Sequence, residues 1–215
     1  MSADELSVVN KHLHKIRRRA LNPLGGIESK RALVDEFAMA HPSILKINAE
    51  CIPVSFEKFQ GEWVSALTSD PNKRILYLHG GGWVAGCVEK YRPHIARIAA
   101  VTGCVVLAID YRLAPESPFP RGLEDCVTAY KWMLQNGSEC SNPSNSSFVM
   151  GDSSGGNLTL ATLLVLKDRQ IDLPDGAIAL SPVTDMTWSS HSIKRNVKSD
   201  AILNAKLMPM ISYAY

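Results

Sequence analysis

The sequence predicts an α/β fold whose mostly parallel sheet carries helices on both faces, and three observations lead to this prediction. Continuous apolar runs such as Val105–Ile109 are typical of parallel strands that are covered on both sides. After an initial pair of strands, the pattern alternates strand, helix, strand, helix, as in an α/β sheet. A serine flanked by glycines also stands between the apolar stretch Phe148–Met150 and the helix-forming run Asn157–Leu166, where a strand passes directly into a helix.

Two helices are expected before the sheet. The first spans Ser2–Ala20, opens with the capping box Ser2-x-x-Glu5 and ends before Asn22-Pro23. The second spans Ser29–Ala40 and is stopped by His41-Pro42.

Six strands are expected, and the first two are predicted to form a hairpin with Gln60-Gly61 as its turn. The last residues, 205–215, have a helix-like apolar pattern without a capping residue, which indicates an interrupted chain. The predicted strands are Ile52–Phe59, Glu62–Leu67, Ile75–His79, Cys104–Asp110, Phe148–Met150 and Ala177–Ser181.

The segment Gly151-Asp152-Ser153-Ser154-Gly155 has the spacing Gly-x-Ser-x-Gly of a nucleophile elbow. A serine on a sharp strand-to-helix turn needs neighbours without side chains, because the flanking backbones crowd the turn. The turn lifts the hydroxyl above the sheet, and the next helix points its first N–H groups toward it. Ser153 is therefore the candidate nucleophile.

A second glycine-rich segment, His79-Gly80-Gly81-Gly82-Trp83, follows the apolar stretch Ile75–Leu78. Three consecutive glycines lose much conformational entropy on folding, and they are useful where backbone N–H groups must approach a ligand closely. An oxyanion that forms on an ester carbonyl is such a ligand. An oxyanion hole of this kind combines a loop N–H with the N–H of the residue after the nucleophile, which is Ser154 here.

Four motifs follow one another along the chain: His79–Trp83, Tyr111–Glu116, Gly151–Leu158 and Ser181–Asp185. Their order resembles that of the hormone-sensitive-lipase-like esterases, the bacterial family IV with an HGGG oxyanion motif and the α/β-hydrolase fold. The resemblance implies Ser153 as nucleophile, the N–H groups of Gly81, Gly82 and Ser154 as oxyanion donors, short- to medium-chain carboxylic esters as substrates, and no cofactor. It also implies that the N-terminal helices form a cap over the site.

No residue of this sequence fits the role of general base or of acid in the expected triad. In this fold the triad follows the order Ser, Asp or Glu, His. The only histidine after Ser153 is His191, six residues beyond Asp185, and two such residues cannot occupy two separate strand ends. Asp168, Asp172 and Asp175 fit the acid's place no better. We therefore expect the N-terminal part of a longer hydrolase, either truncated or completed by a second polypeptide, with a cap segment at 1–48, the α/β core at 49–200 and an interrupted helix at 201–215.

The remaining motif residues have structural interpretations beside functional ones. His79 precedes the oxyanion loop and is expected to hold it by a side-chain hydrogen bond rather than act as general base. Asp152 is expected to support the elbow, together with Gly80. Arg112 and Glu116 are expected to belong to an Arg–carboxylate network that fixes the proline-rich loop after the fourth strand. Trp83 and Tyr111 either line the pocket or pack in the core.

Composition narrows the class of protein further. Net charge is +2, with 20% charged and 46% hydrophobic residues, which is ordinary for a globular domain. The basic run Lys15–Arg19 is interpreted as a solvated helix end, so no nucleic acid partner is expected. There is no secretory signal and no membrane span, which predicts a cytoplasmic location. Five cysteines without C-x-x-C spacing predict neither a disulfide framework nor a metal site.

Three functions stay open at this point. The first is a serine-dependent carboxylesterase whose partners are a small-molecule ester and a second polypeptide. The second is a ligand-binding protein that has lost the catalytic histidine. The gibberellin receptors, which resemble this same family without that histidine, are an example. The third is an amidase or deacetylase with the same site. The oligomeric state is open, and a homo-oligomer is one of the alternatives.

Overall fold

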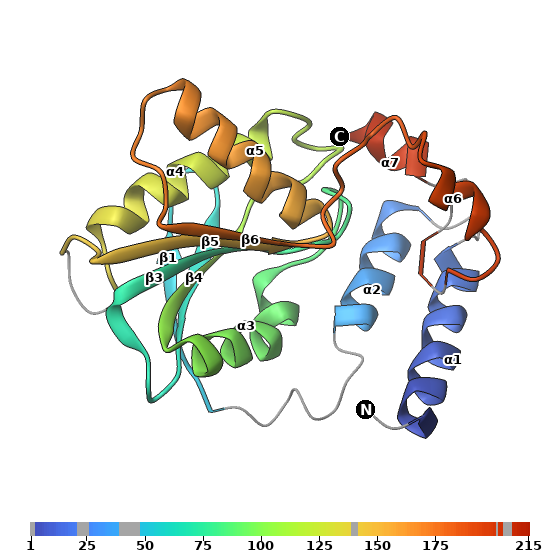
Figure 1. The fold of residues 1–215 in the computed structure, drawn as a ribbon, viewed down its shortest axis with the longest axis horizontal. Helices are drawn as coiled ribbons and strands as arrows, with labels where there is room; N and C mark the ends of the chain where they lie inside the picture. The colour runs from blue at the N-terminus through green and yellow to red at the C-terminus, as the bar shows by residue number, and fades with distance from the viewer. Residues whose placement is uncertain (1–2, 21–25, 39–47, 139–141, 201, 204–207) are drawn as a thin grey trace.

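A six-stranded sheet with the strand order β1-β2-β4-β3-β5-β6 organises the chain (Figure 1). The computed structural model describes residues 3–20, 26–38, 48–138, 142–200, 202–203 and 208–215. Pairing is antiparallel between β1, β2 and β4 and parallel from β4 through β3 and β5 to β6, so the predicted mostly parallel sheet is confirmed. The strands are β1 (Glu50–Ser55), β2 (Gln60–Ser65), β3 (Asp70–Leu78), β4 (Cys104–Asp110), β5 (Ser146–Asp152) and β6 (Gly176–Leu180).

Helices cover both faces of this sheet, as predicted. Helix α3 (Val88–Thr102) lies on one face, and α4 (Arg121–Gln135) and α5 (Ser154–Asp168) lie on the other (Figure 1). Alternate strand residues supply the two cores. Leu76, Leu107 and Val149 pack with α4 and α5, whereas Ile75 and Val106 pack with α3. This alternation follows from the period of two along a strand.

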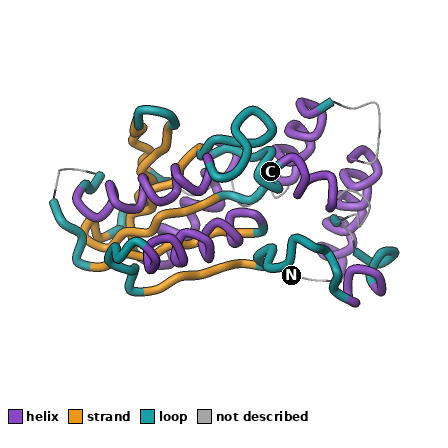
Figure 2. The backbone as a smooth tube through the Cα atoms, turned by 90° about the horizontal axis from the view of Figure 1, so that it is seen from above, coloured by secondary structure: helices purple, strands orange, loops and turns teal. Residues whose placement is uncertain are grey.

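The other described helices group at one end of the molecule (Figures 1 and 2). They are α1 (Ala3–Ala20), α2 (Ile27–Ala38), α6 (His191–Arg195) and α7 (Met208–Ala214). Helix α7 contacts the glycine-rich loop, since a β-carbon on Gly82 would lie 3.0 Å from the Ile211 side chain. The predicted N-terminal helices therefore exist, but Ser2 of the capping box and residues 39–40 lie outside the described residues.

The hairpin turn predicted at Gln60-Gly61 is wrong. The turn is at residues 56–59, where the Phe56 N–H donates to the Phe59 carbonyl at 3.0 Å, and the two phenyl rings stack with centroids 4.3 Å apart. Gly61 lies inside β2, where a β-carbon would be 2.6 Å from the Ala108 carbonyl oxygen. Burial of Phe59 against the core outweighs the turn preference of a Gln-Gly pair. Both predicted strands shift toward the N-terminus accordingly.

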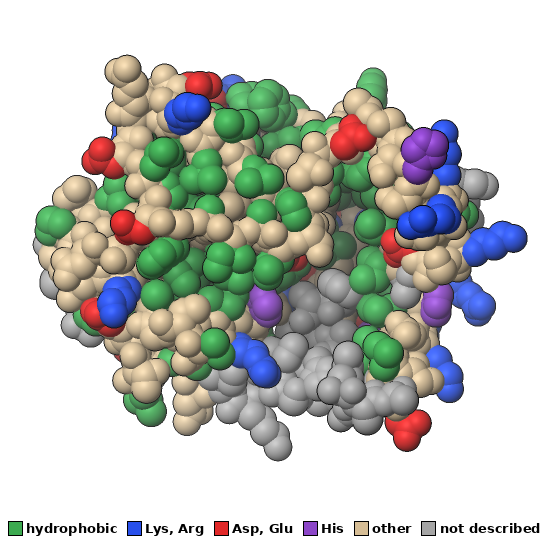
Figure 3. Space-filling model, in the orientation of Figure 1, with side chains coloured by type: hydrophobic (Ala, Val, Ile, Leu, Met, Phe, Trp, Pro, Cys, Tyr) green, Lys and Arg blue, Asp and Glu red, His purple; other side chains and the backbone are tan. Residues whose placement is uncertain are grey.

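The outer strand β6 is more exposed than a parallel strand usually is. Within the described residues it pairs with β5 alone, and Ile178 and Leu180 are 47% and 38% exposed. Leu164 of the neighbouring α5 is 63% exposed. Figure 3 shows hydrophobic side chains gathered over this part of the molecule. Apolar strands of parallel sheets are normally covered on both faces, so this edge has the character of an interior element.

Candidate active site

Ser153 occupies the turn between β5 and α5, as the motif predicts. Its backbone has φ 54° and ψ −118°, a conformation that residues with a β-carbon rarely adopt and that is held only where the surroundings impose it. Here the Ser153 N–H donates to Leu180 O of β6 at 2.9 Å, and the Ser153 carbonyl accepts from the N–H groups of Asn157 and Val183 at 3.1 and 3.2 Å. The side chain is partly exposed. The Ser153 hydroxyl therefore lies on an accessible turn whose backbone is fixed by three hydrogen bonds.

The glycines of the motif allow three backbone segments to cross at this turn. A β-carbon on Gly155 would lie 2.0 Å from Leu78 O and 2.5 Å from His79 O, and one on Gly151 would lie 2.4 Å from Gly155 O. No side chain fits at these distances. The start of α5 therefore lies directly against the end of β3, where the glycine-rich loop begins.

The glycine-rich loop has an unusual backbone. Gly81, Gly82 and Trp83 all have positive φ, at 131°, 65° and 60°. The Gly81 carbonyl accepts from the N–H groups of Val84 and Ala85 at 3.3 and 3.1 Å, which closes a tight turn. A β-carbon on Gly81 would be 2.0 Å from Ala85 O. The turn itself therefore requires glycine at position 81.

Asp152 connects the elbow to this loop. Its Oδ1 accepts the Gly80 N–H at 2.9 Å and the Tyr77 hydroxyl at 2.7 Å, and its Oδ2 accepts the Tyr91 hydroxyl at 3.4 Å. Burial, reinforced by the Asp152 carboxylate, raises the pKa of both phenols well above the usual range. Both tyrosines therefore stay protonated and act as donors.

His79 and Tyr111 form a second brace behind the loop. Nδ1 of His79 lies 2.8 Å from Gly80 O, and the ring stacks on Tyr111 with centroids 4.4 Å apart. The Tyr111 hydroxyl donates to His79 O at 2.8 Å. Burial lowers the pKa of His79, so the imidazole is neutral and Nδ1–H is the donor. These contacts agree with the expectation that His79 holds the loop.

Trp83 and Tyr111 both pack in the interior of the described part of the chain. They are 1% and 2% exposed. Trp83 stacks on Tyr215, with ring centroids 4.6 Å apart, and its carbonyl accepts the Ala114 N–H at 2.9 Å. Ser154 is fully buried at the start of α5.

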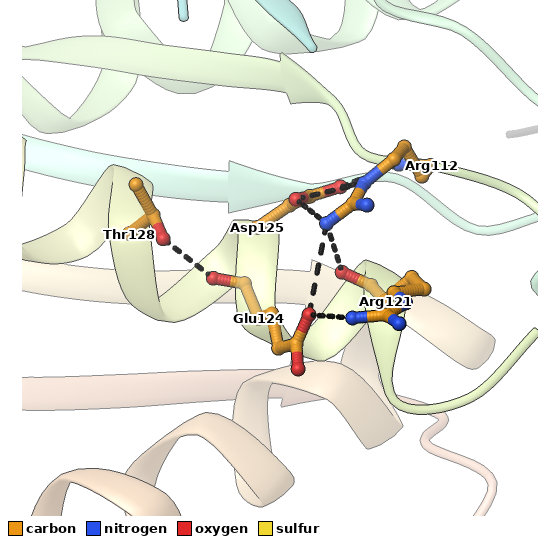
Figure 4. Close-up of polar contacts among 5 residues, drawn as sticks. All are labelled: Arg112, Arg121, Glu124, Asp125 and Thr128. Carbon is orange, nitrogen blue, oxygen red and sulfur yellow. Dashed lines mark hydrogen bonds and ion pairs between the residues drawn. The ribbon is translucent and has the colours of Figure 1, made fainter. Parts of the chain in front are cut away.

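Arg112 and Glu116 belong to two separate networks and do not pair with each other. Arg112 donates to both carboxylate oxygens of Asp125, from Nη2 at 2.7 Å and from Nε at 2.9 Å (Figure 4). Its backbone N–H also donates to Asp125, at 2.9 Å. Glu116 instead accepts from Arg31 of α2. Sequence reasoning missed Asp125, although an acidic residue on the apolar face of α4 is a signal for a buried partner.

Asp185 makes local contacts within its own loop. It accepts hydrogen bonds from the Thr187 hydroxyl, from the Thr187 backbone N–H at 2.8 Å and from Ser189 Oγ at 2.9 Å. These hydrogen bonds, that of the Thr187 hydroxyl most of all, lower the pKa of Asp185 to about 2. His191 is exposed at the start of α6. Across the part of the chain that the structure describes, there is no group of three or more potential metal ligands. No helix within that part has the length and apolar character to cross a membrane.

Comparisons with known proteins agree with this architecture. A sequence profile described as alpha/beta hydrolase fold matches residues 75–215. A crystal structure of an esterase from the bacterial hormone-sensitive lipase family superposes on this chain with a TM-score of 0.86 at 33% sequence identity. The superposition covers 100% of this chain and 69% of the esterase chain. This chain belongs to the hormone-sensitive lipase family of α/β hydrolases.

Two curated relatives of this hormone-sensitive lipase family member are an acetyl-hydrolase and an esterase. The acetyl-hydrolase of Streptomyces hygroscopicus is 37% identical over 136 residues, which are 62% of this chain and 44% of the relative. The esterase of Acinetobacter venetianus is 32% identical over 156 residues, which are 73% of this chain and 50% of the relative. The chain thus spans about half the length of these two relatives.

Proposed function

We propose that this chain carries the nucleophile and the oxyanion hole of a carboxylic ester hydrolase that forms an acyl-enzyme on Ser153. One observation carries the proposal: the strained turn at Ser153 and the glycine-rich loop after β3 meet at a backbone contact that only glycine permits, at Gly155 and Leu78. Two preorganised backbone elements then surround one carbonyl group. A relative named esterase supports an ester as substrate, and a relative named acetyl-hydrolase supports the short end of the proposed short- to medium-chain range.

In the proposed reaction, Ser153 Oγ attacks the carbonyl carbon while its proton passes to a histidine. The N–H groups of Gly81, Gly82 and Ser154 stabilise the negative oxygen of the tetrahedral intermediate. The intermediate collapses, the ester C–O bond breaks, and the histidine returns the proton to the departing alcohol. Water then attacks the acyl-serine by the same route and releases the acid.

The histidine and the acid of the triad come, in this proposal, from polypeptide outside these residues. The exposed apolar edge at β6 and the exposed Leu164 of α5 are a suitable surface for further strand and helix (Figure 3). Because the Ser153 N–H is bonded to Leu180 at the end of β6, a strand added beside β6 ends near the nucleophile. Strand carboxyl ends are where such folds place catalytic groups.

The test joins residues 1–215 to the part of the solved bacterial esterase that follows the matched region. We expect this joined protein to hydrolyse p-nitrophenyl butyrate, and Ser153→Ala to lower kcat by roughly 10⁴-fold or more. Circular dichroism and a cooperative thermal transition establish that the protein is folded. If the joined protein is folded and binds p-nitrophenyl esters with acyl chains of two to eight carbons but does not hydrolyse them, the hydrolase proposal is contradicted. Faster hydrolysis of a p-nitroanilide than of the corresponding ester identifies an amidase.

A further inference from the structure

Arg31 of the N-terminal helix α2 uses every N–H of its guanidinium in contacts that reach two distant loops. Nε donates to Val84 O at 2.8 Å, and Nη2 donates to Ala114 O at 3.3 Å. Nη1 and Nη2 donate to the two carboxylate oxygens of Glu116 at 3.0 and 2.7 Å, and Nη1 also donates to Glu28 at 3.0 Å. These five contacts match the five donors of the side chain.

The two carbonyls that Arg31 holds belong to the loops that build the candidate site. Val84 closes the tight turn of the glycine-rich loop through its N–H and Gly81 O. Ala114 lies in the loop after β4 and donates its N–H to Trp83 O at 2.9 Å. Arg31 therefore lies where the oxyanion loop, the loop after β4 and the cap helix meet.

Packing joins the same three segments. Val84, Ala85 and Ala114 form a small buried cluster, and Ile27 and Val34 of α2 pack against it. Arg31 is on the same helix, between Ile27 and Val34, so the apolar contact and the guanidinium act on one surface. A lysine at this position has no planar fork and offers a single cationic nitrogen.

The salt bridge to Glu116 is not the main reason to single out Arg31. The Glu116 side chain is 57% exposed, and exposed ion pairs add little stability. The carbonyl contacts matter more, because Trp83 is not a glycine and has a φ of 60°, a conformation that persists only where surrounding groups impose it. Ala114 and Arg31 hold the two carbonyls that follow Gly82, those of Trp83 and Val84.

We propose that Arg31 is a positioning residue that holds the turn at Gly81–Ala85 in the conformation that presents the oxyanion donors, so that docking of the cap helix and assembly of the oxyanion hole are coupled. The catalytic meaning of this assignment rests on the proposed function. The structural part does not, because the position of the turn can be measured without substrate.

The experiment is hydrogen–deuterium exchange of the Val84 and Ala85 amides, which donate to Gly81 O, in the full chain and in Arg31→Gln. Loss of a charge-assisted hydrogen bond is expected to speed their exchange roughly ten- to a hundredfold. The matched control is Arg19→Gln on α1, where Arg19 pairs with Glu36 of α2. This control loosens the cap helices without touching the loop and is expected to leave both amides within about twofold of wild type.

Exchange at Val84 and Ala85 that is unchanged in Arg31→Gln while α2 exchanges faster overturns the proposal, because Arg31 then anchors only the helix. Equal acceleration in both variants overturns it too. If Arg31→Gln unfolds, Arg31→Lys is measured at the same amides, where intermediate exchange supports the proposal and wild-type exchange contradicts it. In the joined protein, a loosened turn with unchanged kcat contradicts the oxyanion role of Gly81 and Gly82 and leaves the positioning of the turn by Arg31 supported.

Discussion

At the scale of single residues, the candidate site depends on positions where no side chain fits and on a carboxylate that joins the two turns. Gly151 and Gly155 allow β5, α5 and β3 to approach at backbone distances. Asp152 then joins the elbow to Gly80 through one carboxylate that three donors share. Steric exclusion and hydrogen bonding therefore position Ser153 and the loop together.

Gly155→Ala tests the steric part. A methyl group at this position would lie 2.0 Å from Leu78 O, a backbone atom that cannot rotate away. We expect the free energy of unfolding to fall by at least about 3 kcal/mol, as measured by urea denaturation. Gly26→Ala is the matched control, since nothing lies within 4 Å of its added methyl, and a change of under about 1 kcal/mol is expected there. Equal effects at both glycines would contradict the steric argument.

Burial of His79 predicts a pH dependence of stability. Burial is the main cause that lowers the pKa of His79 below its usual value of 6.5. Below pH 6.5 the unfolded chain takes up a proton that the folded chain does not, so stability falls as pH decreases, by up to about 1.4 kcal/mol per pH unit. Urea unfolding from pH 7.5 to 5.5 measures this slope, and His79→Gln is expected to flatten it. Parallel curves for the two proteins would show that His79 is not the source.

At the scale of secondary structure elements, polar side chains attach the loops at the carboxyl ends of the strands to particular helices. Arg112 follows β4 and binds Asp125 of α4 (Figure 4), whereas Glu116 of the same loop binds Arg31 of α2. Asp110, at the end of β4, accepts the Val88 N–H at the start of α3 at 2.7 Å. Each of these contacts fixes the direction in which the chain leaves the sheet.

The Arg112–Asp125 contact is expected to contribute most within its network. The Asp125 side chain is 3% exposed and satisfies both the guanidinium and the Arg112 backbone N–H. Asp125→Ala leaves these donors unpaired, and we expect a loss of about 2 to 4 kcal/mol in the free energy of unfolding. Glu124→Ala on the same helix is the control. Glu124 is 41% exposed and 3.8 Å from Arg112, so less than about 1 kcal/mol is expected. A larger loss at Glu124 would contradict this ranking.

At the scale of the whole molecule, the sheet is well covered at its centre and open at β6. The central strand β4 is buried from Cys104 through Ile109, whereas Ile178 and Leu180 of β6 are exposed. The candidate nucleophile lies next to this open edge, because its N–H is bonded to the last residue of β6. The part of the molecule that carries Ser153 thus adjoins the surface best suited to further polypeptide.

The purified 215-residue chain is expected to be nearly inactive on p-nitrophenyl butyrate by itself. Without a general base the Ser153 hydroxyl has no acceptor for its proton, and loss of a triad member lowers turnover by roughly 10⁴- to 10⁶-fold. Initial rates are compared with those of the joined protein, and intact mass spectrometry checks that no second polypeptide is present. Turnover equal to that of the joined protein, abolished by Ser153→Ala, would mean that the general base lies within these residues.

The alternation of strands and helices and the two glycine-rich turns could be predicted because their signals are local. The apolar run of β4 coincides with the observed strand, and the Gly-x-Ser-x-Gly spacing predicts the turn at Ser153. The turn at Phe56–Phe59 could not be predicted in this way, because its position depends on burial of Phe59 in a core formed by distant residues. The pairing of Glu116 with Arg31 was equally inaccessible, since several arginines are chemically equivalent candidates in the sequence.

By itself, the sequence determined that strands and helices alternate. It also determined that the serine of the elbow and the triple glycine each come directly after a strand, because apolar periodicity and glycine spacing act over a few residues. Only the tertiary structure decided that β3 and β5 are neighbours, which brings these two turns together, and that Arg31 reaches the loop 53 residues further along the chain. Such contacts depend on which elements pack side by side. That choice is made by the burial of the whole apolar surface, which no short segment specifies.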